Sequence, residues 1–144
     1  MKVTVKFEGG RQLDAALSQF DERKRRAIGR KALDEAGQIM AKSMREKAPV
    51  DEGGLRESID VGGVLAKGPK KAHPKKAEQE RYVGPSNHPK AVQQEFGNEN
   101  HAAQPFARPA LDETKEAVVK RISDELWIGI EKAVKAAERK ALKG

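Results

Sequence analysis

A long run of helical periodicity at the end of the chain sets the strongest limit on its fold. Between residues 109 and 142, apolar side chains recur at spacings of three and four, as on one face of a helix. The main stripe consists of Leu111, Val118, Ile122, Leu126, Ile130, Ala133 and Ala137. This helix would be about 50 Å long, whereas a compact domain of this size is roughly 35–40 Å across. We therefore expect the C-terminal helix over residues 109–142 to overhang its own core.

A second stripe on the same predicted helix contains Trp127, Val134 and Ala141. Aromatic side chains are enriched in subunit interfaces, and tryptophan is also common in the cores of single subunits. We predict that Trp127 and Val134 contact a neighbouring subunit, and an ordinary core position for Trp127 is the alternative.

The stretch before this helix, residues 95–111, combines one glycine, two prolines and two phenylalanines. The prolines restrict the residues that precede them to extended backbone, and Gly97 can turn the chain. We predict a stiff anchor segment here, in which Phe106 is buried and Glu95 pairs with Arg108. Its structural residues would be Glu95, Phe96, Gly97, Pro105, Phe106, Arg108 and Pro109. The alternative is an ordinary loop that places one phenylalanine in a core.

The rest of the chain alternates strand and helix patterns. Alternation predicts strands over residues 2–8, 59–61 and 81–84, and helical spacing predicts helices around residues 13–20, 22–48 and 89–96. Asp21 is the expected N-cap of the helix over 22–48. Val92 and Phe96 would form the apolar face of the short helix over 89–96, and residues 48–58 would form a tight loop.

Charge gives a prior on the partners of the protein. The net charge is +7, and a basic protein favours polyanions such as nucleic acid. Part of this charge lies in a predicted mobile hairpin loop over residues 67–79, which includes Lys70, Lys71, Lys75 and Lys76. A basic flank over Arg23–Lys31 is more simply a solvated helix face.

Composition excludes several functional classes. The 144 residues most simply form a single domain, residues 1–144. The absence of cysteine excludes disulfides and thiolate chemistry. No apolar run approaches the roughly 20 residues of a membrane span, and the N-terminus does not resemble a signal peptide. We expect a soluble protein made in a cytoplasm, with no membrane partner.

No catalytic, cofactor-binding or metal site is predicted. His73, His88 and His101 stand in three separate loops without the spacing of a metal site. No phosphate loop, dinucleotide fingerprint or nucleophile motif is present. An acid–base pair of Glu95 and Asp112 is a weak alternative to a structural role for Glu95.

Four segments form an ordered set along the chain: Ala48–Ile59 (APVDEGGLRESI), Tyr82–Pro85 (YVGP), Glu95–Gly97 (EFG) and Gln104–Leu111 (QPFARPAL). In this order they resemble the neck or tail-completion proteins of long-tailed bacteriophages, which are encoded between the head-connector and tail-tube genes. With the N-terminal strand and the helix around Leu13, the resemblance covers roughly residues 1–125. Asn98 and Ala107 depart from the threonine and the bulkier apolar residue that are common in the family, and the lysine loop and the C-terminal helix are longer than usual.

The resemblance implies an α+β fold, with a small antiparallel sheet packed against a long central helix and a long C-terminal helix. It also implies a non-enzymatic structural protein of the virion, located in the tail or neck and in the host cytoplasm during assembly. Its partners would be further copies in a ring, a hexamer or a dodecamer, together with the head-connector and the tail-terminator or tail-tube proteins. DNA would pass through the ring, with non-specific contacts from the lysine loop.

Two rival functions remain at this point. A free nucleic-acid-binding module would use the lysine loop and the Arg23–Lys31 flank, and its DNA binding would be sensitive to salt. A small nuclease would need clustered carboxylates or histidines, which the sequence does not show.

Overall fold

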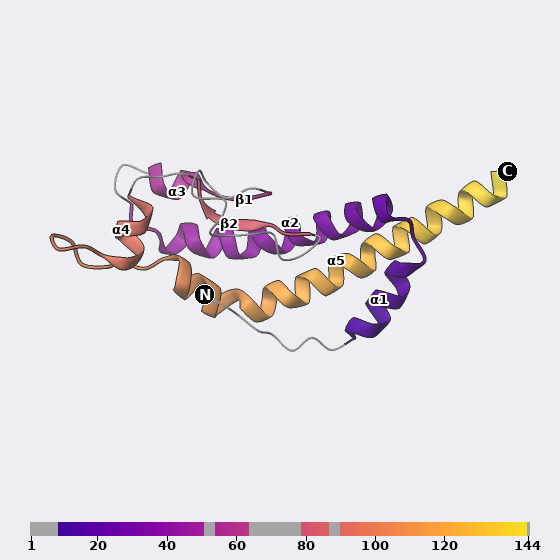
Figure 1. Ribbon diagram of the computed structural model, residues 1–144, viewed down its shortest axis with the longest axis horizontal. Coiled ribbons are helices and arrows are strands. Elements are labelled where there is room, and N and C mark those ends of the chain that lie inside the picture. The colour runs from indigo at the N-terminus through magenta and orange to yellow at the C-terminus, as the bar shows by residue number, and fades with distance from the viewer. Residues whose placement is uncertain (1–8, 51–53, 64–78, 87–89, 144) are drawn as a thin grey trace.

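The computed structural model describes residues 9–50, 54–63, 79–86 and 90–143 (Figure 1). The predicted strand over 2–8 and the four lysines of the basic loop lie outside these ranges. The described elements are helix α1 (Gly10–Ser18), helix α2 (Glu22–Lys47), helix α3 (Gly54–Ser58), strand β1 (Ile59–Gly62), strand β2 (Tyr82–Pro85), helix α4 (Ala91–Phe96) and helix α5 (Ala107–Lys143).

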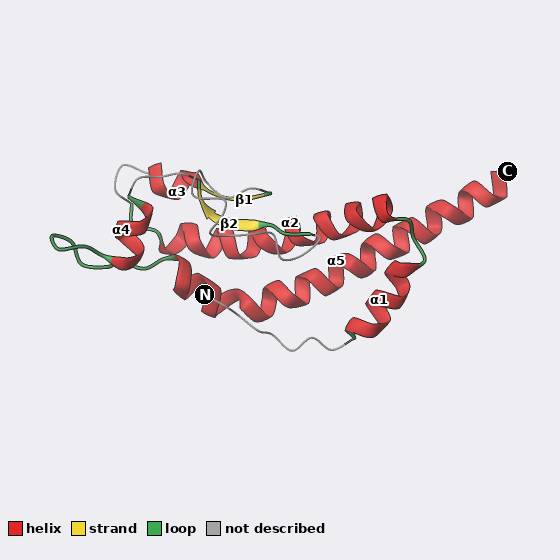
Figure 2. Cartoon of the chain, viewed as in Figure 1, coloured by secondary structure: helices red, strands yellow, loops and turns green. Residues whose placement is uncertain are grey.

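Helix α2 is the central element of the fold. The antiparallel pair β1–β2 packs on α2, and α5 also runs along α2, in the opposite chain direction (Figures 1 and 2). Helix α1 packs against α5. The prediction of an α+β fold with a small antiparallel sheet on a long helix, followed by a long C-terminal helix, is confirmed.

Local signals explain where α2 begins and how the sheet is fixed to it. The Asp21 side chain accepts a hydrogen bond of 2.8 Å from the backbone N–H of Lys24, so the predicted N-cap is confirmed. In the sheet, Ile59 pairs with Pro85 and Val61 with Val83. The Arg45 guanidinium of α2 donates two hydrogen bonds, of 3.0 and 2.7 Å, to the carbonyl oxygen of Ile59. These bonds fix the start of β1 against α2.

The core is built mainly from small side chains around one aromatic ring. Its buried members come from α2, α3, β1 and the start of α5, together with the residue that follows α2 and the residue that precedes α5. They are Ala41, Met44, Ala48, Leu55, Ile59, Phe106 and Ala110. Phe106 and Ile59 are the largest side chains that are almost completely enclosed. Because alanines provide little apolar area, the Phe106 ring supplies a large share of what this core can bury.

Two expectations about local structure are corrected. Residues 54–58, expected in a tight loop, form the short helix α3, which turns Leu55 into the core while Arg56 donates a hydrogen bond to the carbonyl of Ala48. On α4, Val92 and Phe96 do not face the core: they are 68% and 78% exposed, and Gln94 is the buried residue of that helix. The apolar face expected from Val92 and Phe96 therefore points toward solvent.

Gly37 allows the sheet to approach α2 closely, and this gives a testable prediction. A Cβ atom at Gly37 would lie 2.9 and 3.0 Å from the two methyl groups of Val61 and 3.3 Å from a methyl group of Val83. Overpacking of this kind costs about 1–3 kcal/mol, against a gain in helix propensity of about 1 kcal/mol. We expect Gly37→Ala to lower the free energy of unfolding by about 1 kcal/mol in urea titrations.

The matched control is Gly29→Ala in the same helix. There the added Cβ would be 3.6 Å from the Cγ atom of Gln79, an ordinary contact, so the helix-propensity gain of up to about 1 kcal/mol should remain. Equal effects of the two substitutions would contradict the close approach of sheet and helix.

Candidate assembly surfaces

The anchor segment is held by the carboxylate of Glu95 at the end of α4. Its Oε2 atom accepts hydrogen bonds from the backbone N–H groups of Phe106 and Ala107, at 2.8 and 2.9 Å, and its Oε1 atom accepts one from Arg108 at 3.0 Å. A negative side chain at a helix N-terminus also interacts favourably with the helix dipole. Glu95 therefore caps the first turn of α5.

Pro109 completes the cap because it has no N–H group to satisfy. The expected helix began at Pro109. In the structure α5 begins two residues earlier, at Ala107, so Pro109 is its third residue. The expected link between Glu95 and Arg108 exists through the Arg108 backbone. No ion pair between the two side chains is found in the described part of the chain, and the Arg108 side chain is exposed.

The loop between α4 and α5 is closed by hydrogen bonds of its own. Gly97 has a φ of 75°, and a Cβ atom there would lie 2.8 Å from the backbone nitrogen of Ala103. Asn98 and His101 pair through their backbones, and the Gln104 N–H donates to the carbonyl of Gln94 at 2.7 Å. The exposed Pro105 then leads directly into the buried Phe106. The anchor residues are thus brought together around Glu95 and Phe106, with the Phe96 ring outside.

A carboxylate clamp joins the same end of α5 to α2. Glu113 accepts a hydrogen bond of 3.0 Å from the Ser43 hydroxyl and forms an ion pair with Lys47. Lys47 and Ser43 together hold the pKa of Glu113 below its ordinary value. The clamp therefore stays ionised at neutral pH and fixes the pairing of the two long helices.

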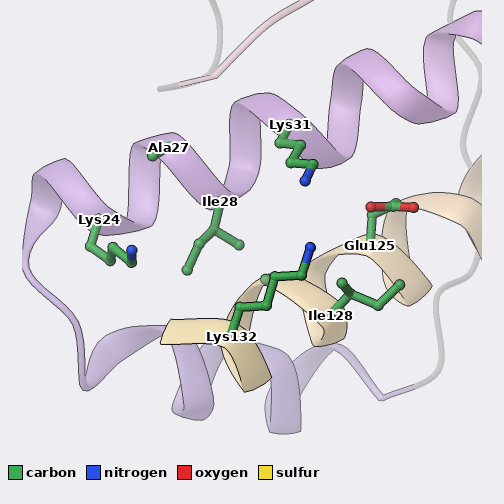
Figure 3. A pocket seen from close by; sticks show the side chains of 8 residues that line it. Lys24, Ala27, Ile28, Lys31, Glu125, Ile128 and Lys132 are labelled. Atoms are coloured by element: carbon green, nitrogen blue, oxygen red, sulfur yellow. The ribbon is translucent and has the colours of Figure 1, made fainter. Parts of the chain in front are cut away.

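An open depression lies between the first half of α2 and the second half of α5 (Figure 3). Its volume is about 180 Å³, and its lining combines an apolar floor with charged side chains: Lys24, Ile28, Lys31, Glu125, Ile128 and Lys132. We call it the lysine depression. Figure 3 shows the Lys31 and Lys132 side chains directed toward each other across its opening. Two facing ammonium groups repel each other, so an anionic group between them would be stabilised.

Three lysines and one carboxylate, Glu125, line the lysine depression. Glu125 is in an ion pair with Arg121 at 3.0 Å. Among the residues that the structure describes, no carboxylate forms an ion pair with Lys24, Lys31 or Lys132. The depression therefore presents unneutralised positive charge around apolar side chains.

The positive charge of the chain is concentrated at this end of the helix pair. Residues 22–31 contain six Lys or Arg against one acidic residue, and residues 131–143 contain five against two. Together these segments carry +8, whereas the whole chain carries +7. The Arg23–Lys31 flank is therefore one half of a basic end of the molecule, and α5 supplies the other half. The sequence pattern did not predict that these two segments lie side by side.

The last part of α5 extends past its packing partners. Residues 135–143 are all exposed, and Figure 1 shows them continuing beyond α1 and α2. Trp127 is 38% exposed on α5, and Val134 is partly buried. Next to Trp127, Ile128 is 41% exposed and belongs to the lysine depression.

Of the three histidines, the structure describes only His101. His73 and His88 lie outside the described residues, and the His101 ring is 3.4 Å from the side-chain oxygen of Gln94. Within the described ranges, no group of three or more His, Cys, Asp or Glu residues could hold a metal ion. None of the helices described combines the length and apolarity that a membrane crossing requires.

Comparison with known proteins gives one match. Residues 11–97, more than half of the chain, match the model of the HK97-gp10-like family, which is described as "Bacteriophage HK97-gp10, putative tail-component". A search of curated proteins and a search of solved structures each found no match. The matched range contains α1 to α4 and ends at Gly97. The segment Gln104–Leu111, which also carried the resemblance, follows it.

Proposed function

Because the chain belongs to the HK97-gp10-like family of phage tail components, we propose that it forms a ring at the junction of head and tail. In this proposal it is a non-enzymatic neck or tail-completion protein that acts as a single domain over residues 1–144. It joins the head-connector protein to the tail-terminator or tail-tube proteins. The ring would assemble in the host cytoplasm, become part of the virion and leave a lumen through which DNA passes.

The observation that supports self-assembly is the unequal length of the two long helices. Helix α2 begins at Glu22, and α5 runs past that end of α2 as an exposed helix to Lys143 (Figure 1). An isolated helical extension is marginally stable in water, and most helices in proteins are stabilised by packing. A neighbouring copy that packs on this extension, and on Trp127 and Val134 before it, would provide that packing.

Sedimentation of the purified protein, alone and with tails that lack it, tests this function. We expect a concentration-dependent oligomer in solution or a ring of fixed mass on the tails. A protein that stays monomeric in both settings would contradict the ring.

The basic loop gives a prediction about DNA. Lys70, Lys71, Lys75 and Lys76 would face the lumen or an acidic partner ring, and charge alone would hold DNA without reading its bases. Replacing all four with Glu should reduce DNA retention in particles by about tenfold or more, measured as the ratio of full to empty heads. Replacement of all four with Arg keeps the charge and is the control. Unchanged DNA retention and assembly in the Glu variant would remove this role.

A nucleic-acid-binding module is the second candidate, supported by the basic end of the α2–α5 pair. It predicts that an isolated monomer binds duplex DNA with an affinity that falls steeply as salt is raised. Oligomers without measurable DNA affinity favour the ring.

A further inference from the structure

Two apolar faces of the chain are left open at opposite ends of the helix pair. One is the apolar tip, formed by Val92 and Phe96 of α4, which are four residues apart and so lie on the same side of that helix. The other is the floor of the lysine depression, where Ile128 is exposed beside the buried Ile28. Charged residues border each face. An apolar patch with a charged border is typical of a site that contacts another protein.

The apolar tip cannot reach the lysine depression of its own chain. The Glu95 cap holds α4 at the first residues of α5, and Figure 1 shows α4 at the end opposite to the C-terminus. From Ala107 to Ile128 the α5 axis extends for about 32 Å. A tip that occupies the depression must therefore belong to another copy.

The charges around the two faces are of opposite sign. Residues 90–116, the segment that runs from α4 into the first turns of α5, contain five carboxylates against three Lys or Arg residues. Two of these carboxylates, Glu95 and Glu113, already bind the start of α5 and Lys47. Exposed acids among them are Glu99, Asp112 and Glu116. The depression presents Lys24, Lys31 and Lys132 without described ion-pair partners. Complementary charge favours a specific orientation between two surfaces.

We propose that the apolar tip of one copy docks into the lysine depression of the next copy, head to tail. This rests on the proposed ring and names the two surfaces that close it. Phe96 and Val92 would cover the exposed Ile128 beside the buried Ile28, while carboxylates near the tip would neutralise the facing lysines. A head-to-tail contact uses two different surfaces, and it generates a ring when the rotation closes.

The apolar floor is the reason for choosing protein over DNA as the occupant. A phosphate backbone could neutralise the three lysines, but it offers no apolar group to cover the exposed Ile128. A volume of about 180 Å³ is also below the roughly 300 Å³ at which small-molecule sites begin. The depression therefore fits a protruding side chain from another protein surface.

Two variants with complementary defects test the contact. The tip variant carries Val92→Ser and Phe96→Ser, and the depression variant carries Lys24→Glu, Lys31→Glu and Lys132→Glu. We expect each variant alone to be monomeric, with the dissociation constant for self-association raised about tenfold or more. A mixture should form a 1:1 heterodimer and nothing larger, because it has one intact tip and one intact depression. Sedimentation equilibrium and native mass spectrometry measure both results.

Controls separate this contact from folding and from the ring itself. All altered side chains are exposed or border the open depression, so thermal unfolding should stay close to wild type. Lys42→Glu, at an exposed position of α2 outside the depression, should assemble normally.

If the wild type and both variants assemble equally well, the contact is wrong and the ring stands. If the wild type is monomeric alone and on tails, the ring and the contact both fall. If the depression variant assembles normally but loses binding to a 30-base-pair duplex, the depression is a DNA surface.

Discussion

Phe106→Ala should lower the free energy of unfolding by about 3–5 kcal/mol, the usual cost of removing a buried aromatic ring. The ring is 1% exposed and belongs to the same buried cluster as Met44, Leu55 and Ile59. The other members include three alanines, and alanines cannot move enough atoms into the resulting cavity. Urea titration should show a lower midpoint with an unchanged slope.

Phe96→Ala is the matched control, because it removes the same ring ten positions earlier in the chain. At 78% exposure its loss should change the free energy of unfolding by no more than about 0.5 kcal/mol. The same variant should weaken self-association if the apolar tip binds a neighbouring copy. Equal destabilisation by the two substitutions would contradict the burial of Phe106 in the core.

Glu95→Ala should lower the free energy of unfolding by about 2–4 kcal/mol. Hydrogen bonds to a charged group contribute about 1.5–3 kcal/mol each, and the three that Glu95 accepts from Phe106, Ala107 and Arg108 form one unit whose members are not additive. Without the carboxylate, the first turn of α5 loses its cap and its favourable interaction with the helix dipole. Chemical denaturation followed by circular dichroism measures the loss.

Glu99→Ala controls for the charge, since Glu99 is an exposed carboxylate in the adjoining loop. It should leave the stability within about 0.5 kcal/mol of wild type. Glu95→Gln keeps the size of the side chain and one acceptor oxygen, and should fall between the two. A stability loss that is the same for Glu95→Ala and Glu99→Ala would refute the cap.

Periodicity predicted the large elements of this fold because each has a long regular pattern. The stripe on residues 22–48 and the Asp21 cap gave α2, and the stripe on residues 109–142 gave α5 to within two residues at its start. The strand segment 59–61 is extended by one residue in β1, and the segment 81–84 is shifted by one residue in β2. These elements depend on local patterns that a single sequence contains.

The direction of α4 and the start of α5 depend on a contact that no local pattern encodes. Val92 and Phe96 show that α4 has an apolar face, but the Glu95 cap and the buried Gln94 turn that face outward. The sequence suggested a link between Glu95 and Arg108 but not its backbone donors. A carboxylate twelve residues before a helix start can cap it only through a loop such as the one that Gly97 makes possible.

The lysine depression depends on the pairing of α2 with α5. A Cβ atom at Gly129 would lie 2.7 Å from a methyl group of Ile28, so this glycine brings the helices into close contact beside Lys24 and Lys132. Gly129 within the apolar run Leu126–Ile130 was a signal of close packing. Its partner could not be identified without the register of the two helices.

Trp127 offers the most direct test of assembly through α5, because it is the only tryptophan in the chain and is partly exposed in the single copy. Its emission spectrum and its quenching by acrylamide should be measured across protein concentration, with the mass followed by sedimentation in parallel. We expect the emission to shift to shorter wavelength and quenching to fall as the oligomer forms. An oligomer in which Trp127 remains as accessible as in the monomer would contradict assembly through this face of α5.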